Sequence, residues 1–351
     1  MKAGVLEEIG KIKVKDVPVP QCKSDQVLLR IRFCGICGAD MRDIHHGHPR
    51  LRLPGIMGHE LSGAVQEIGG KARELVFPIK EGDWVTVAPD IGCEKCEFCY
   101  RGQVCANAKS IGYEVPGGFA QQFLVPSSGI RNIFAIPEGV SLKEASLAEP
   151  LSCCINAQER LKIEPGDKVV VMGVGPIGCM HAKLAQLRGA SEILVVDINP
   201  KRLELAKRVL GDADVSYANS HQEDLNKRIK EMTGGKKAEK VIVACPSGSA
   251  EEKSLEIVSR EGTILFFGGL PKQEPFISFD SNLFHYNNLT IVTSSGATLE
   301  HFYLALKLLS IERAHFARIV THVFPLSEIN KGIEVMSKGE GLKTLIEMDE
   351  K

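Results

Sequence analysis

The chain has 351 residues, which is enough for two domains with substantial hydrophobic cores. Its 43 basic and 44 acidic residues give a formal net charge of −1, so the composition argues against a nucleic acid or a membrane surface as a partner. No run approaches the roughly 18 apolar residues of a membrane-spanning helix, and acidic residues appear early in the N-terminal MKAGVLEEIGKIKVKD, unlike in a signal peptide. We therefore expect a cytoplasmic protein.

Residues 1–150 carry short β-like runs separated by glycine and proline. The runs include QVLLRIRF (26–33), LSGAVQEIG (61–69) and DWVTVAP (83–89). Runs rich in β-branched residues and bounded by turn residues are typical of strands. This part of the chain is therefore predicted to form a mainly β domain.

Beyond it, short apolar strands alternate with helices. The first strand is Lys168–Met172, followed by a helix over 176–188, a strand over 193–197 and a helix beginning at Pro200, where the missing N–H costs nothing. Further strands are predicted at 240–245, 263–268 and 289–295, and further helices at 222–232 and 250–259. This alternation predicts the α/β class with a parallel, doubly wound sheet.

The C-terminal segment has a helical pattern near 299–310 and ends in the strand TLIEM (344–348). We expect this segment to return to the first domain. The predicted organisation is therefore discontinuous: residues 1–152 and 297–351 form one domain, and residues 153–296 form an inserted nucleotide-binding domain.

Four cysteines lie close together in the run GCEKCEFCYRGQVC; they are Cys93, Cys96, Cys99 and Cys105. Structural zinc takes four protein ligands in a tetrahedron, and closely spaced CxxC steps suit a loop wrapped around one ion. A set of disulfides is the alternative, but the expected compartment is reducing. The remaining cysteines outside the metal patterns are expected to be small buried hydrophobes: Cys22, Cys34, Cys153, Cys154, Cys179 and Cys245.

A second metal-binding pattern combines Cys37 in FCGICGAD with His59 and Glu60 in PGIMGHELSG. Catalytic zinc takes about three protein ligands and leaves a position for water or substrate. This set of residues suits such an open site. Cys34 is the competitor of Cys37 for the ligand position.

The run VVVMGVGPIGCMHAKLA contains Gly173, Gly175 and Gly178 in GxGxxG spacing, with Ile177 in the same turn. The run follows a strand, opens a helix and has Asp197 at the end of the next strand, which makes it a dinucleotide-binding fingerprint. The glycines allow the tight turn, the close approach of the pyrophosphate and the close packing of helix and strand. The pyrophosphate is expected at the helix N-terminus.

Asp197 is placed to accept hydrogen bonds from the adenosine ribose, and its charge should disfavour a 2′-phosphate. We therefore expect NAD rather than NADP. Arg202 leaves a second possibility open, since a nearby arginine accepts that phosphate; it is otherwise part of a solvated helix face or stacks on adenine. Gly268 and Leu270 follow a later strand and are expected either to line the nicotinamide end or to form a simple turn.

Taken together, these motifs resemble the zinc-containing medium-chain dehydrogenase/reductase family. The resemblance rests on GICGAD, GHELSGAVQEIG, the four-cysteine loop and VMGVGPIG in this order, and it covers nearly the whole chain. It implies a GroES-like catalytic domain and a Rossmann dinucleotide-binding domain. It also implies that Cys37 and His59 bind catalytic zinc and that Cys34 does not.

The third ligand separates branches of the family. Where alcohol dehydrogenases have a second cysteine, this chain has Glu149 in AEPLSCC, which resembles the polyol branch that includes the sorbitol dehydrogenases. Glu60 is then either a carboxylate beside the ligands or an exchangeable ligand. The resemblance implies a zinc-dependent hydride transfer from a secondary alcohol, such as a linear, cyclic or phosphorylated polyol, to NAD.

The chain also departs from the family pattern. Ala39 stands where serine or threonine usually starts the proton relay, and Arg42 stands near a common histidine position. Arg42 is expected either to bind a more oxidised or charged substrate or to make a surface salt bridge. Cys99 and Cys105 are closer together than is usual in the family, which predicts a tighter zinc loop.

Two other functions stay open at this point. One is an alcohol or threonine-type dehydrogenase with a smaller substrate, which would keep the metal and the cofactor. The other is a non-catalytic nucleotide-binding relative, which the presence of Cys37, His59 and Glu149 argues against. By resemblance, a homodimer or a homotetramer is expected.

Overall fold

The computed structural model describes residues 1–348, except for the side chains of residues 312–315. The chain divides into two compact units. The first contains Met1–Ser152 and the segment that starts at Gly296, and the second is Cys153–Ser295. The division expected from the sequence places the second boundary one residue later.

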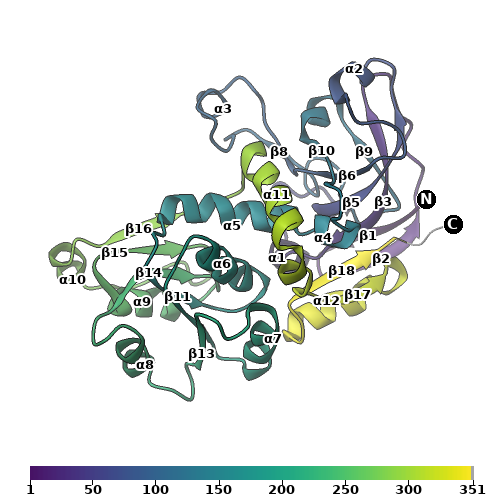
Figure 1. The fold of residues 1–351 in the computed structure, drawn as a ribbon. Helices are drawn as coiled ribbons and strands as arrows, with labels where there is room; N and C mark the ends of the chain where they lie inside the picture. Colours follow the sequence, from purple (N-terminus) through teal and green to yellow (C-terminus); the bar gives the residue numbers. More distant parts are fainter. Residues whose placement is uncertain (349–351) are drawn as a thin grey trace. The chain divides into compact units, whose positions relative to one another are not determined.

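The first unit is built on a β-sheet that joins both ends of the chain (Figure 1). Within residues 1–348 this sheet has seven strands in the order β10-β6-β5-β3-β18-β17, with β9 also paired to β3. The strands are β3 (Val27–Gly35), β5 (Glu60–Ile68), β6 (Trp84–Val87), β9 (Gln122–Val125), β10 (Ile133–Ala135), β17 (Val320–Pro325) and β18 (Lys343–Glu347). Smaller sheets are formed by β1 (Lys2–Glu8), β2 (Lys11–Asp16) and β4 (Gly55–Ile56), and by β7 (Asp90–Ile91) and β8 (Lys109–Ser110).

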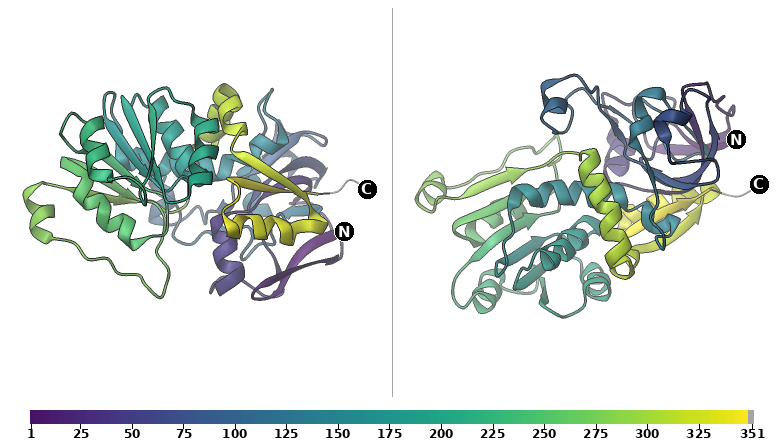
Figure 2. Two further views of the ribbon diagram at one scale, coloured as in Figure 1. Left: turned by 90° about the horizontal axis from the view of Figure 1, so that it is seen from below. Right: turned by 45° about the horizontal axis from the view of Figure 1, so that its top comes forward.

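The last strand ties the C-terminal segment into the first unit. β18 runs antiparallel to β3, with Ile346 opposite Cys34, and parallel to β17. Helix α12 (Ile329–Lys338) lies beside these two strands (Figure 2). The strand expected at 344–348 is therefore present one residue earlier, and it brings Leu345 opposite Gly35, at the end of β3.

The helices of the first unit are short, apart from those near its boundary with the second. They are α1 (Gly38–His46), α2 (Arg73–Val76), α3 (Glu97–Tyr100), α4 (Leu142–Ala145), α11 (Leu299–Ala317) and α12, with 3₁₀ turns at Ser127–Asn132 and Leu326–Glu328. Helix α5 (Ala148–Leu161) runs from the first unit into the second. One apolar core, which includes Leu29, Ile36, Leu61 and Ile346, fills the centre of the unit.

The second unit contains a parallel sheet flanked by helices (Figure 1). Across its described residues the sheet has six strands in the order β13-β12-β11-β14-β15-β16. The strands are β11 (Lys168–Met172), β12 (Glu192–Asp197), β13 (Val215–Asn219), β14 (Ala238–Val243), β15 (Val258–Phe266) and β16 (Thr290–Thr293). The helices are α6 (Pro176–Leu187), α7 (Pro200–Leu210), α8 (Leu225–Met232), α9 (Gly248–Ile257) and α10 (Ser281–Tyr286).

The strand order reverses between β11 and β14, and ligands bind outside the carboxyl ends of the strands at such a switch point. Val169, Val170 and Val171 of β11 are completely buried, as expected for a central strand covered on both faces. The predicted doubly wound α/β fold is thereby confirmed.

Some elements differ from the sequence-based expectation. β13 was not predicted, because VSYAN is only five residues long and mixes polar with apolar residues. Helix α10 was also missed, and α11 continues to Ala317 beyond the expected end near 310. β15 spans Val258–Phe266 and so starts earlier than predicted and ends before Gly268. None of the helices in the described part of the chain is long and apolar enough to cross a membrane.

Candidate functional site

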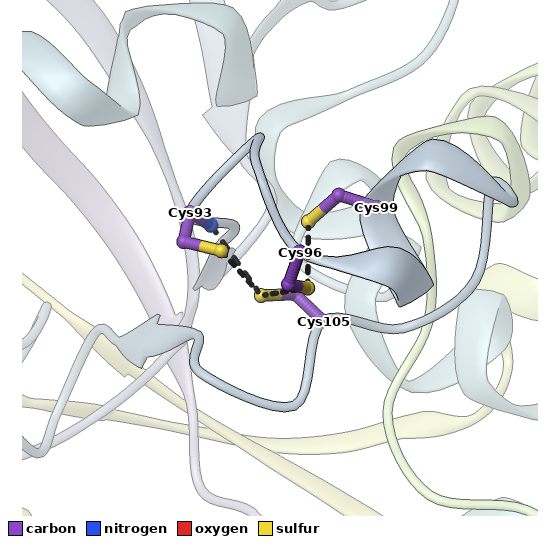
Figure 3. A group of neighbouring side chains, drawn as sticks. All are labelled: Cys93, Cys96, Cys99 and Cys105. Carbon is purple, nitrogen blue, oxygen red and sulfur yellow. Dashed lines mark hydrogen bonds between the residues drawn. The ribbon is translucent and has the colours of Figure 1, made fainter.

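The four cysteines of the predicted zinc loop converge on one point (Figure 3). They lie on the segment between β7 and β8, around helix α3. The Sγ atom of Cys96 is 3.5 Å from that of Cys99 and 3.8 Å from that of Cys105, which is 3.6 Å from that of Cys93. A tetrahedral zinc ion with Zn–S bonds of about 2.3 Å has sulfurs about 3.8 Å apart. These four side chains therefore fit a structural zinc ion.

Backbone amides donate hydrogen bonds to some of these sulfurs. Cys93 N and Asn107 N donate to Cys105 Sγ at 3.4 Å and 3.3 Å. A backbone hydrogen bond from Cys99 is the main cause that lowers the pKa of Cys96 to about 6. A lowered pKa favours the deprotonated sulfur that binds metal.

Replacing Cys96 with serine should remove one of two zinc ions per chain, because a structural site needs all four ligands. The measurement is zinc per protein by inductively coupled plasma mass spectrometry after dialysis. Cys22→Ser is the control, since Cys22 lies outside both groups of metal-binding residues. Equal zinc content in Cys96→Ser and wild type would show that this loop does not hold a metal.

A second group combines Cys37, His59 and Glu60, whose ligand atoms all lie within 4.8 Å of one another. Cys37 is the N-cap of α1, and His59 and Glu60 lie at the start of β5. The antiparallel pairing of β3 with β5 places Gly35 opposite Glu60 and so brings the two segments together. The set of one sulfur, one imidazole and one carboxylate fits an open zinc site.

Asp40 orients both segments of this site. Its carboxylate is buried, accepts a hydrogen bond from Cys37 N at 2.9 Å and lies 3.5 Å from His59 Nδ1. Since a metal-binding histidine is held by a partner on its other nitrogen, Asp40 can fix the ring of His59. Its approach to His59 depends on the fold, because the two residues lie on separate segments of the chain.

Glu60 forms a buried ion pair with Lys343, which the sequence analysis missed. Lys343 Nζ donates to the Glu60 carboxylate at 2.5 Å and to Ile36 O at 3.1 Å, and both side chains are almost completely buried. Burial alone would lower the pKa of Lys343, but the charges of Glu60, Cys37 and Glu149 and the hydrogen bond to Glu60 together outweigh it and raise the pKa. A Cβ atom on Gly35 would lie 1.9 Å from Glu60 Oε2, so this carboxylate needs glycine at position 35.

Glu149 lies in the first turn of α5 and is half-buried. Among the described residues, it is outside the group whose ligand atoms lie within 4.8 Å of one another. Its charge helps to raise the pKa of Lys343, less strongly than the charges of Glu60 and Cys37 do, so it belongs to the same electrostatic neighbourhood. Cys34 is completely buried, points toward Gly35 O at 3.8 Å and lies outside both groups.

The glycine-rich turn follows β11 and opens α6. Gly173 has φ 91°, which favours glycine, and a Cβ atom on Gly178 would lie 1.9 Å from Gly173 O. Gly175 is the N-cap of α6, and Ile177 is its second residue, so both lie where backbone N–H groups point at an anion. These positions agree with the predicted phosphate-binding turn.

Asp197 ends β12 and is buried. Its two carboxylate oxygens accept hydrogen bonds from Val174 N and from Asn199 N, both at 2.8 Å. The side chain therefore connects the glycine-rich turn to the start of α7, in addition to any contact with a cofactor. The sequence alone did not predict that Val174 N and Asn199 N donate to this carboxylate, because these contacts depend on the folded backbone.

Cys245 follows β14 and contacts both glycine segments. A Cβ atom on Gly173 would lie 2.7 Å from Cys245 Cβ, and one on Gly268 would lie 3.0 Å from Cys245 C. Leu270 lies close to the start of α9, 3.9 Å from the Cβ position of Gly248. The predicted cofactor residues after β11 and β15 are thus close together, with Cys245 between them.

Arg202 lies on α7 and is half-buried. Within the described part of the chain, its buried Nε atom has no hydrogen-bond partner. A buried donor without a partner costs stability unless a ligand or water satisfies it. This observation favours a role in binding over a solvated helix face.

Comparisons with known proteins cover both units of the chain. Residues 23–138 match the family described as "Alcohol dehydrogenase GroES-like domain", and residues 176–310 match the one described as "Zinc-binding dehydrogenase". The D-xylulose reductase A of Aspergillus niger is 30% identical over 97% of this chain and 95% of its own length. The sorbitol dehydrogenase of Bacillus subtilis strain 168 is 32% identical over 82% of this chain and 83% of its own.

A solved structure from Sinorhizobium meliloti 1021, assigned as a zinc-binding dehydrogenase and bound to NADP, has a TM-score of 0.89 to this chain. It is 27% identical in sequence, and the similarity covers 99% of this chain and 98% of the other. The same fold thus extends over both units.

Proposed function

This chain belongs to the zinc-containing medium-chain dehydrogenase/reductase family, and we propose that it oxidises a secondary hydroxyl of a polyol to a ketone with NAD. The observation that carries the proposal is the convergence of Cys37, His59 and the buried Glu60 carboxylate, whose ligand atoms lie within 4.8 Å of one another, with Glu149 in the same electrostatic neighbourhood. A four-thiolate site has no free position, whereas this set leaves room for substrate.

The residues of this site would have different roles. Cys37, His59 and Glu149 would hold the catalytic zinc, with Glu60 beside them as a carboxylate balanced by Lys343. When bound, zinc acts as a Lewis acid that lowers the pKa of an alcohol. Asp40 would keep the His59 ring and the Cys37 backbone in place.

The cofactor would be held by the glycine-rich turn of the second unit. Gly173, Gly175 and Gly178 allow the backbone to approach the pyrophosphate, and the N-terminus of α6 favours its charge. Asp197 would accept hydrogen bonds from the adenosine ribose, with Arg202 near it. Gly268 and Leu270 would line the nicotinamide end, where the hydride is accepted.

The proposed substrate class is supported by two relatives, a D-xylulose reductase and a sorbitol dehydrogenase. It is also supported by the carboxylate side chains at the metal site, because carboxylate ligands suit oxygen-rich substrates.

The test is NADH formation by the zinc-loaded protein with linear, cyclic and phosphorylated polyols and with simple alcohols and amino alcohols. Turnover of polyols that is lost on chelation and restored by zinc is expected. Turnover confined to simple or amino alcohols would contradict the polyol assignment.

Asp197→Ser should reduce the preference for NAD over NADP about 10- to 100-fold, because a charged hydrogen bond is worth about 1.5–3 kcal/mol. The measurement is the ratio of kcat/KM for the two cofactors. Asp212→Ser is the control, since Asp212 is an exposed acid of the same unit that pairs with Lys207. A ratio equal to that of the control would show that Asp197 only accepts hydrogen bonds from backbone N–H groups and does not contribute to the preference for NAD.

The assembly is proposed to be a homodimer or homotetramer located in the cytoplasm. β16 is the edge strand of its sheet, and Tyr286, shortly before it in the chain, is 70% exposed. Thiolate ligands need a reducing compartment. Light scattering coupled to size-exclusion chromatography measures the mass, and a monomer at micromolar concentration would contradict the proposed assembly.

A further inference from the structure

Arg42 is held in one orientation by a buried acid. Its Nε and Nη2 atoms donate to the two carboxylate oxygens of Asp43, at 2.8 Å and 3.3 Å. The side chain of Asp43 is 0% exposed, whereas that of Arg42 is 55% exposed. Asp43 also accepts a hydrogen bond of 2.6 Å from the Tyr113 hydroxyl, so the acid is fixed from two sides.

This arrangement leaves one edge of the guanidinium group available. The group has five N–H donors, and the edge formed by Nε and Nη2 binds Asp43. The other edge, formed by Nη1 and Nη2, offers a second pair of parallel donors, which is the geometry that binds a carboxylate or phosphate in bidentate fashion. Over the described residues, Asp43 is the only partner of Arg42.

The fixed guanidinium lies beside the metal site. Arg42 and Asp43 are on α1, the helix that Cys37 caps. Tyr113, which binds Asp43, follows Gly112, whose Cβ position lies 3.4 Å from Gly58 N.

Gly58 directly precedes His59, so the bond between Asp43 and Tyr113 joins the two segments that carry these metal-binding residues. The hydrogen bond to Asp43 and, less strongly, the charge of Cys37 raise the pKa of Arg42. The Arg42 side chain is therefore close enough to Cys37 for the charge of that cysteine to affect the pKa of Arg42.

We propose that the free edge of Arg42 binds an oxyanion of the substrate, so that the enzyme selects polyols that carry a carboxylate or phosphate group. The inference rests on the proposed polyol oxidation and narrows its substrate. A lysine at this position would offer charge without the paired donors, and Asp43 already balances the charge of Arg42. Recognition therefore depends on the paired hydrogen bonds rather than on net charge.

The test compares three six-carbon polyols: sorbitol, sorbitol 6-phosphate and gluconate. The zinc-loaded wild type, Arg42→Met and Arg42→Lys are assayed for kcat/KM with NAD, and binding of each compound to the holoenzyme is measured by calorimetry. Arg73→Met is the matched control, because Arg73 is 57% exposed, pairs with one carboxylate, Glu81, and lies outside both groups of metal-binding residues.

At least one of the two anionic compounds should be preferred over sorbitol by tenfold or more in wild type and in Arg73→Met. The preference should disappear in Arg42→Met and be only partly kept in Arg42→Lys. The compound preferred, gluconate or the phosphate, identifies the anion.

Equal or better use of sorbitol by wild type, or a preference that survives Arg42→Met, would overturn the inference and leave polyol oxidation intact. If no polyol is oxidised, the proposed function fails, and calorimetry still decides the inference. Binding of an anionic compound that depends on Arg42 supports it, and binding that is absent or independent of Arg42 overturns it.

Discussion

Replacing Glu149 with alanine is expected to lower kcat/KM for the preferred alcohol about a thousandfold. Removing a ligand of catalytic zinc weakens a charge stabilisation worth several kcal/mol, and each 1.36 kcal/mol is about tenfold in rate. The prediction distinguishes Glu149 from Glu60 as the third zinc ligand. Glu60, and not Glu149, belongs with Cys37 and His59 to the group whose ligand atoms lie within 4.8 Å of one another. Lys343 already occupies the Glu60 carboxylate, which favours Glu149 as the third ligand.

Steady-state kinetics and zinc content should be measured together for Glu149→Ala and Glu149→Gln. Glu159→Ala is the control, since it makes the same change at an exposed position of the same helix. The control should keep both zinc ions and nearly full activity. If Glu149→Ala behaves like the control while Glu60→Ala loses one zinc ion, then Glu60 is the ligand.

Much of the fold follows from local sequence. The apolar run Lys168–Met172 is a strand with the predicted bounds, and α7 begins at Pro200 as expected. Glycines at fixed spacing predicted the turn around Gly173, because only a residue without a side chain allows this approach of backbone atoms. The metal-binding group from Cys93 to Cys105 was predicted from the spacing of its four cysteines, because all of them lie on one loop.

The parts that sequence reasoning missed depend on contacts between distant segments. Lys343 directly precedes the predicted strand 344–348 and was not singled out, yet β18 includes it, pairs with β3 and places it against Glu60. Similarly, Tyr113 reaches Asp43 only because the loop after β8 folds back on α1. No local periodicity encodes such contacts, since they depend on strand order and register.

The buried pair of Lys343 and Glu60 leads to the second prediction. Lys343→Met should destabilise the protein by about 3–5 kcal/mol, because it leaves a buried carboxylate without its cation. The measurement is the urea midpoint and free energy of unfolding at a fixed zinc concentration, followed by circular dichroism. Zinc content should fall as well, since the uncompensated Glu60 would change its position or take up a proton.

Lys331→Met is the matched control, because Lys331 makes a surface pair with Glu328 and its side chain is 64% exposed. Exposed pairs contribute little, so the unfolding midpoint of the control should stay at the wild-type value. The double variant Lys343→Met with Glu60→Met separates the two explanations. If the cost of Lys343→Met comes from an unpaired charge, the second change should restore stability while activity stays low. If stability falls further, the two side chains are instead needed for packing.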